Sequence, residues 1–207
     1  MLITIARHGE TLANENDILQ GQLPGELSKK GWVQAEGVAR ALKDKHFDVI
    51  FSTDLKRGLD TARVIAQYHT SRFVLDPLLR ERHFGVFQGT SRTRFYQLER
   101  ALPDPAAHQP EGGESFADLA ERARKFLKQI RVEFRGLAVL VASHGDVNRM
   151  LLGMAQNLTV QAACQIPQTN GCLNVVEMNH SGDCRVLKLN SIDHLSQDER
   201  SFNKTTL

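Results

Sequence analysis

Short apolar runs alternate along this chain with segments in which apolar residues recur at helical spacing. We expect strands at about residues 2–6, 48–52, 73–75, 137–142, 175–178 and 185–189. We expect helices at about residues 29–45, 54–68, 115–130 and 146–156. Because a parallel strand pair needs a long crossover connection, this alternation favours a parallel sheet with helices on both faces. The expected fold is an α/β, three-layer αβα sandwich with a mainly parallel central sheet.

The charge balance and the apolar runs exclude two classes of partner. The 207 residues include 26 Lys and Arg against 24 Asp and Glu, which gives a formal net charge of +2. A polybasic nucleic-acid-binding protein would carry a much larger positive excess. No apolar run approaches the roughly 18–20 residues of a membrane helix, and residues 1–6 lack the basic start of a secretory signal. We therefore expect neither nucleic acid nor a membrane as partner.

The cysteine content points to a reducing compartment. Cys164, Cys172 and Cys184 are an odd number of cysteines, which argues against a disulfide framework. No paired C-x-x-C spacing supports a zinc site built from them with His180 or His194. Free cysteines pack as small apolar residues. We expect buried thiols and a cytoplasmic protein.

Two of the expected strands end in a histidine that is followed by glycine. The first strand leads into His8 and Gly9, and the strand at about 137–142 leads to His144 and Gly145. In open α/β sheets ligands bind at the carboxyl ends of the strands, and glycine lets a ligand approach the backbone closely. The sequence therefore predicts that both histidines belong to one site.

Arginines accompany these histidines. Arg7 precedes His8, and Arg57 lies in the first turns of the helix that follows the strand at about 48–52. A guanidinium group binds oxyanions through its fork of N–H donors, and a helix N-terminus adds its own positive end. Arginine would repel a metal ion, and no G-x-S-x-G motif suggests a Ser-His-Asp hydrolase. The residues favour a phosphate-binding site without a metal.

Five short motifs occur in order along the chain. They are Arg7-His8-Gly9-Glu10-Thr11 with Asn14, Leu27-Ser28-x-x-Gly31-x-x-Gln34-Ala35, Ser52 to Ala62 with Arg57, Leu79 to Gly89 with Glu81, and Ser143-His144-Gly145. Together they resemble the signature of the histidine phosphatase superfamily, also called phosphoglycerate mutase-like. The resemblance extends over the whole chain and implies that fold, a phosphorylated substrate and no cofactor.

The resemblance also implies a role for each of five side chains. His8 would be the nucleophile that attacks phosphorus and forms a phosphohistidine. Arg7, Arg57 and His144 would hold the phosphoryl oxygens, and Glu81 would protonate the leaving group and then activate water. These roles agree with the chemistry, since a neutral imidazole is a competent nucleophile and phosphoryl transfer mainly needs positioning and charge neutralisation.

Further contacts are expected from the loop after the first strand. Asn14 is usually a pocket residue in the superfamily. Thr11, Gln20 and Gly21 lie on the same loop, so we expect them to contact the substrate as well.

Two branches of the superfamily remain open. The run from Glu81 to Gly85 resembles phosphoglycerate mutases, but no adjacent arginine pair follows between Gly89 and Gly112. The Phe87-Gln88-Gly89 turn is more similar to fructose-2,6-bisphosphatase-like, broad-specificity and α-ribazole phosphatases. We expect a phosphatase acting on a small phosphorylated metabolite, with a cofactor-dependent mutase and a low-turnover phosphate-sensing or protein-binding member as alternatives.

The domain organisation follows from length and from proline and glycine content. We expect one domain over residues 1–207, with an excursion at about 88–135 that roofs the active site. Four arginines between Arg80 and Arg94 either bind a second phosphate or carboxylate of the substrate or form a solvated face. The polar end from about Gln197 is expected to fray, and the sequence does not indicate an oligomeric state.

Overall fold

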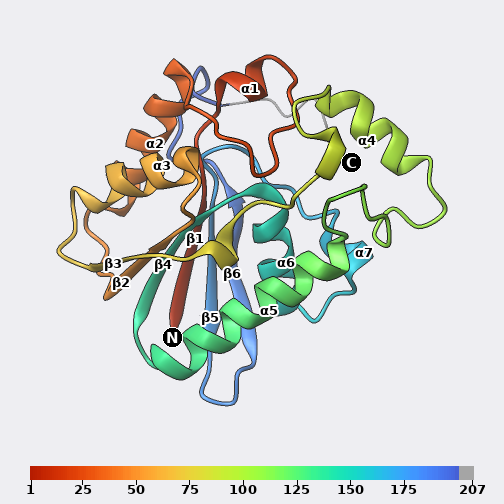
Figure 1. The fold of residues 1–207 in the computed structure, drawn as a ribbon. Helices are drawn as coiled ribbons and strands as arrows, with labels where there is room; N and C mark the ends of the chain where they lie inside the picture. Colours follow the sequence, from red (N-terminus) through yellow and green to blue (C-terminus); the bar gives the residue numbers. More distant parts are fainter. Residues whose placement is uncertain (201–207) are drawn as a thin grey trace.

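The computed structural model describes residues 1–200 and contains one six-stranded sheet in the order β3-β2-β4-β1-β5-β6 (Figure 1). The strands are β1 (Leu2–Arg7), β2 (Val49–Ser52), β3 (Arg72–Leu75), β4 (Ala138–Ser143), β5 (Leu173–Met178) and β6 (Cys184–Ser191). Strands β1 to β4 are mutually parallel, whereas β5 runs antiparallel to β1 and β6 antiparallel to β5. The expected mainly parallel α/β sheet is confirmed.

Helices cover both faces of this sheet. They are α1 (Leu12–Glu15), α2 (Lys29–Leu42), α3 (Lys56–Ala66), α4 (Arg92–Arg100), α5 (Phe116–Glu133), α6 (Gly145–Ala155) and α7 (Val160–Ala163), with short 3₁₀ turns at Pro77–Leu79 and Gly85–Phe87. In β2, Ile50 packs with residues of α2 and α3, while Val49 and Phe51 pack with residues of α5 and α6. This alternation is what a strand buried on both faces requires.

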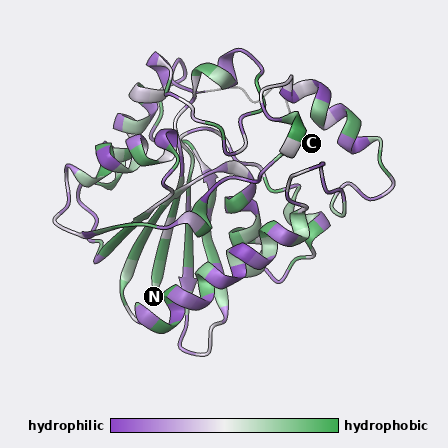
Figure 2. Ribbon diagram, in the orientation of Figure 1, coloured by the Kyte–Doolittle hydropathy of each residue, from purple (hydrophilic) through white to green (hydrophobic). Residues whose placement is uncertain are grey.

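The apolar residues are concentrated in the central strands and on the inward sides of the helices (Figure 2). Val38, Ala39 and Leu42 of α2 pack in one apolar cluster with Ile50 of β2, and they recur at the helical spacing seen in the sequence. Ser28 caps α2 by accepting a hydrogen bond from the backbone N–H of Gly31 at 3.0 Å. Within residues 1–200 no helix is both long and apolar enough to cross a membrane.

The expected excursion at about 88–135 is shorter than its sequence suggested. Helix α5 belongs to the sandwich, because Leu119, Phe126 and Ile130 lie in the main apolar core. The Phe126 ring meets the Phe51 ring of β2 edge-on, with 5.4 Å between centroids. The segment outside the sandwich therefore ends at Ser115, which caps α5, and the boundary at about residue 135 is corrected accordingly.

The end of the described chain returns to α2. The Gln34 side chain donates from Nε2 to the Glu199 carbonyl at 2.7 Å, and Leu195 is 2% exposed. The polar end expected to fray from about Gln197 thus includes residues that contact the fold. The rest of that end, residues 201–207, lies outside the described residues.

Candidate active site

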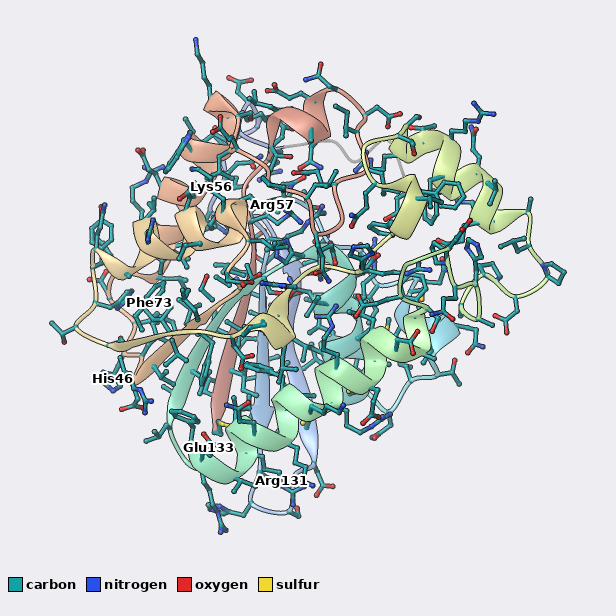
Figure 3. The ribbon with its side chains drawn as sticks, in the orientation of Figure 1. His46, Lys56, Arg57, Phe73, Arg131 and Glu133 are labelled. Atoms are coloured by element: carbon teal, nitrogen blue, oxygen red, sulfur yellow. The ribbon has the colours of Figure 1, made fainter. Side chains whose placement is uncertain are left out.

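The carboxyl ends of β1, β4 and β2 meet at one edge of the sheet. Arg7 pairs with Ser143 in the β1–β4 register, so His8 and His144 begin their loops side by side. Their rings lie 5.1 Å apart between centroids. Arg57 is in the first turn of α3, just after β2, and Figure 3 labels it above these strand ends. The three strand ends therefore bring their polar residues together.

A pocket lies over these strand ends. It is lined by seven of the residues that the sequence singled out: Arg7, His8, Asn14, Gln20, Gly21, Arg57 and Glu81. Of the other two, His144 contacts the His8 ring and Thr11 is fully buried. Thr11 Oγ1 accepts hydrogen bonds from the Asn14 backbone N–H at 3.1 Å and from Gln20 Nε2 at 2.7 Å. Thr11 therefore stabilises the loop and does not line the pocket.

The hydrogen bonding of His8 fixes which ring nitrogen is free. His8 Nδ1 lies 2.7 Å from the Gly9 carbonyl oxygen, which can only accept. Nδ1 therefore carries the proton, and Nε2 keeps its lone pair. Burial lowers the pKa of His8 well below its ordinary value, and the charges of Arg57 and Arg7 lower it further. His8 is a neutral imidazole with an available Nε2.

The two guanidinium groups are held by backbone carbonyls. Arg57 donates from Nη2 to Gly21 O at 2.7 Å and from Nη1 to Leu23 O at 3.1 Å, and Arg7 Nη1 donates to Gln168 O. Burial lowers the pKa of Arg57 to about 10, so this side chain still carries its charge at neutral pH. Neither guanidinium forms an ion pair with a carboxylate in the described part of the chain.

Several buried nitrogen atoms at the site have no hydrogen-bond partner within residues 1–200. They are Arg7 Nε, Arg57 Nε and both ring nitrogens of His144. Burying a polar group without a hydrogen-bond partner costs free energy, and a bound ligand could supply the missing partners. Two guanidinium groups with unpartnered N–H donors are suited to bind the oxygens of a phosphoryl group.

Glu81 brings a carboxyl group to the pocket. Its Oε1 accepts hydrogen bonds from the backbone N–H groups of Arg82 at 3.0 Å and Asp146 at 3.2 Å. Burial raises the pKa of Glu81, and the neighbouring Asp146 carboxylate raises it further. Arg149 Nη1 in turn pairs with Asp146 Oδ1 at 2.5 Å. A raised pKa makes the protonated carboxyl more accessible, and a general acid needs that form.

The loop after β1 adds polar groups to the same pocket. Asn14 Oδ1 accepts from the Thr11 backbone N–H at 3.1 Å, which leaves the Asn14 amide donors for a ligand. Gln20 Oε1 is buried without a hydrogen-bond partner in the described residues. Gly21 contributes its carbonyl, which holds Arg57, and its φ of +54° favours glycine.

Sequence reasoning left the role of Arg92 open and did not assign six other residues to the pocket: Ile18, Leu19, Phe84, Tyr96, Asp146 and Arg149. Tyr96 and Arg92 come from α4, and Asp146 and Arg149 come from α6. Asp146 and Arg149 could have been predicted, because a helix that starts at a strand end places its first turns at the site. Arg92 was one of the four arginines between Arg80 and Arg94, and it alone of them lines this pocket.

The other three arginines of that segment have different environments. Arg80 pairs with Asp54 at 2.5 Å, and Arg82 is fully buried against Glu99 at 2.9 Å. Arg94 is exposed. Of the two alternatives expected for this segment, Arg92 is placed to contact a substrate and Arg94 lies on the solvated face. Arg80 and Arg82 instead form ion pairs within the protein.

The described residues contain no cluster of three or more His, Cys, Asp or Glu side chains placed to hold a metal ion. Cys164, Cys172 and Cys184 are free thiols, and the first two are buried. Burial raises the pKa of Cys172 to about 11, which keeps this thiol protonated. The thiols are not placed for chemistry at the pocket.

An imidazole with a free Nε2, two buried guanidinium groups without a carboxylate partner among residues 1–200 and a carboxyl with a raised pKa at the ends of parallel strands are typical of an α/β enzyme that acts on phosphate esters. The family model described as "Histidine phosphatase superfamily (branch 1)" matches residues 3–192. The chain belongs to this superfamily.

Two curated relatives illustrate the similarity. The chain is 36% identical over 173 residues to "Fructose-2,6-bisphosphatase TIGAR B" of Danio rerio, covering 77% of this chain and 67% of the relative. It is 37% identical over 162 residues to "Metal-independent phosphoserine phosphatase" of Arabidopsis thaliana, covering 72% and 66%. The chain thus spans about two thirds of the length of each. Both relatives are named as phosphatases, and relatives named as mutases also occur.

Solved structures share the fold over almost their whole length. A mycobacterial glucosyl-3-phosphoglycerate phosphatase described with VO₃ has a TM-score of 0.81 and 26% identity, covering 92% of this chain and 99% of that one. The α-ribazole phosphatase of Shigella flexneri has a TM-score of 0.83 and 24% identity, covering 92% and 96%. The chain is therefore similar to phosphatases in both sequence and fold.

Proposed function

We propose that this chain is a metal-independent phosphatase that hydrolyses phosphomonoesters of small metabolites through a phosphohistidine on His8. The observation that carries the proposal is the bond from His8 Nδ1 to the Gly9 carbonyl, because it leaves Nε2 as the nucleophile. The unpaired donors of Arg7, Arg57 and His144 around it support binding of the phosphoryl oxygens.

The first step transfers the phosphoryl group to the protein. The Nε2 lone pair of His8 forms a bond to phosphorus while the bond from phosphorus to the ester oxygen breaks. The electron pair of that bond passes to the leaving oxygen, and the Glu81 carboxyl supplies its proton. Arg7 and Arg57 neutralise the charge on the equatorial oxygens, which is the main demand of this chemistry.

The second step returns His8 to its starting state. Glu81, now ionised, takes a proton from water as the water oxygen attacks phosphorus. The bond between phosphorus and Nε2 breaks, its electron pair returns to the ring, and inorganic phosphate leaves. One carboxyl acts as acid and then as base, so its pKa must lie where both forms are accessible.

The mouth of the pocket supports a substrate with a second anionic group. Arg92 and Arg149 line it in addition to the arginines at His8, and their side chains are 17% and 13% exposed. Asp146 balances Arg149, whereas Arg92 lies 3.9 Å from the nearest Asp17 oxygen, beyond hydrogen-bond distance. The positive charge at the mouth is thus only partly neutralised. Phosphoserine and fructose 2,6-bisphosphate, after which the two relatives are named, each carry such a second group.

The segment from Phe84 to Ser115 is proposed to roof the pocket, since Phe84, Arg92 and Tyr96 line it from that side. A cytoplasmic location is proposed from the free cysteines. The proposed partner is a small phosphorylated metabolite, with neither nucleic acid nor membrane involved.

A phosphate-release assay without added metal tests the proposal. The panel contains 4-nitrophenyl phosphate, fructose bisphosphates, phosphoserine, phosphoglycerates and α-ribazole phosphate, with His8→Ala as the blank. Release by the wild type and none by His8→Ala is the expected result. Interconversion of phosphoglycerates only after bisphosphoglycerate is added would establish the mutase alternative. Phosphate binding without turnover would establish the low-turnover alternative.

A pair of variants tests recognition of the second anion. Arg92→Gln is expected to raise KM about tenfold for substrates with a second anion and to leave 4-nitrophenyl phosphate unaffected. Such a loss corresponds to about 1.4 kcal/mol, close to the lower end of the range for a hydrogen bond to a charged group. Arg94→Gln is the matched control, because it removes an exposed arginine from the same helix. Equal effects of the two variants would contradict the assignment of Arg92.

A further inference from the structure

The carbonyl that orients His8 belongs to a peptide group that is itself held from α2. Gly9 O accepts the proton of His8 Nδ1 at 2.7 Å. The N–H at the other end of the same peptide group, that of Glu10, donates to Gln34 Oε1 at 2.7 Å. Because a peptide group is planar, fixing its N–H also fixes the direction of its C=O. Gln34 therefore aims the carbonyl that selects the His8 tautomer.

The preceding peptide group, between His8 and Gly9, is fixed independently. The Gly9 N–H donates to Thr61 Oγ1 at 3.2 Å, and the His8 carbonyl accepts from the Gly171 N–H at 3.1 Å. The backbone around Gly9 is therefore held on both sides, and Gln34 controls the peptide that touches the imidazole.

Gln34 is itself placed with little freedom. It is fully buried, and its Nε2 donates to the Glu199 carbonyl at 2.7 Å. A side chain at Gly9 would come within 2.2 Å of the Gly31 carbonyl of α2, so this helix and the loop after β1 are in close backbone contact. A rigid helix thus delivers the amide acceptor to the Glu10 N–H.

We propose that Gln34 is a positioning residue that keeps His8 in the tautomer with a free Nε2, acting through the peptide group between Gly9 and Glu10. Its role in turnover rests on the proposed function, whereas its effect on the tautomer does not. Which ring nitrogen of a histidine carries the proton is set by the hydrogen bond that the other makes. Without the Gln34 acceptor the peptide can rotate, and a share of His8 then carries its proton on Nε2 and cannot attack phosphorus.

Two substitutions at Gln34 separate the acceptor from the packing. Gln34→Met keeps the length of the side chain and removes the amide acceptor, and Gln34→Glu keeps an acceptor oxygen. Gln34→Met is expected to lower kcat about 100-fold, the scale of a small misplacement of a reacting group, with KM nearly unchanged. Gln34→Glu is expected to restore most of kcat. Arg40→Met is the matched control, since Arg40 is an exposed α2 residue that pairs with Glu36 and lies 3.9 Å from Glu199.

A spectroscopic measurement tests the inference without relying on turnover. In protein labelled with ¹⁵N at histidine, the His8 signals, identified by their loss in His8→Asn, report which ring nitrogen is protonated. Wild type and Arg40→Met are expected to show the proton on Nδ1, and Gln34→Met a mixture with the proton on Nε2.

The outcomes are distinct. If Gln34→Met has a lower melting temperature but keeps both the wild-type tautomer and kcat, its role is only structural and the proposal fails. If no protein in the series releases phosphate from any substrate but the tautomer shifts as expected, the proposed function fails and the positioning role of Gln34 stands.

Discussion

The Glu81 and Asp146 side chains line one pocket, and the backbone N–H of Asp146 donates to Glu81 Oε1 at 3.2 Å. Burial raises the pKa of Glu81, and the negative charge of Asp146 adds to the effect. Asp146 is 1% exposed, and its Oδ1 pairs with Arg149 Nη1 at 2.5 Å. Asp146 is therefore placed to raise the proton affinity of the carboxyl group that we propose as the general acid.

The first prediction concerns the alkaline side of the pH profile. Glu81 must be protonated to serve the leaving group, so kcat is expected to fall as the pH rises through its raised pKa. Asp146→Asn removes the neighbouring charge and lowers the pKa of Glu81, so the decline should move to lower pH. The measurement is kcat against pH for both proteins. A wild-type rate that stays flat up to about pH 9–10, well above the ordinary range of a carboxyl group, would remove Glu81 from this role.

The second prediction distinguishes proton donation from other roles of Glu81. Glu81→Gln cannot supply a proton and is expected to lower kcat about 10²–10⁴-fold for alkyl phosphates, the usual contribution of a general acid. The loss should be much smaller in the phosphorylation step with 4-nitrophenyl phosphate, whose phenolate leaves without a proton. Burst kinetics with the two substrate types measure that step. An equal loss for both would mean that Glu81 positions the phosphoryl group.

Much of this site was predictable because the sequence marks where strands end. The carboxyl ends of parallel neighbours coincide in space, so His8, His144 and Arg57 had to converge once their strands were recognised. The fold followed from the same apolar runs. Local pattern was sufficient for His8, His144 and Arg57, which follow closely after strand ends, but it did not reveal Asp146 and Arg149.

The remaining residues depend on tertiary placement that local pattern does not encode. Arg80, Arg82, Arg92 and Arg94 are alike in sequence, yet they face Asp54, a buried interior, the pocket and solvent respectively. The environment of each arginine depends on how the segment before α5 folds over the sheet. The length of that segment was overestimated for a similar reason. Proline and glycine mark its irregular part, but only packing shows that α5 belongs to the core.

The third prediction concerns stability in acid. The pKa values of His8 and His144 are both lowered by burial and by Arg57. Below about pH 6.5 the unfolded chain therefore binds protons at these two histidines more strongly than the folded chain does. Stability is therefore retained above the unfolded pKa of about 6.5 and lost as the pH falls below it, by up to about 1.4 kcal/mol per pH unit for each histidine. Urea unfolding at several pH values measures this slope.

Two variants test whether these histidines cause the slope. His8→Asn and His144→Asn should each reduce it, whereas His180→Asn, which removes an exposed histidine, should leave it unchanged. If all three variants keep the wild-type slope, the loss of stability in acid is due to other groups.

The fourth prediction concerns the buried ion pair that anchors α4. Arg82 is fully buried, donates to Glu99 Oε1 at 2.9 Å and lies 4.0 Å from the centre of the Phe116 ring. Glu99→Ala leaves that guanidinium buried without its carboxylate and is expected to cost about 3–5 kcal/mol in the free energy of unfolding. Urea denaturation gives this value directly.

The double variant Arg82→Met/Glu99→Leu removes both charges and refills most of the volume. It should recover most of the stability lost in Glu99→Ala, because replacing a buried pair by apolar groups is often neutral, whereas removing one partner is not. Its unfolding should also remain cooperative, since the apolar side chains pack against the Phe84 and Phe95 rings that already meet there. If Glu99→Ala is as stable as the wild type, the Arg82 charge finds compensation elsewhere and the pair does not anchor α4.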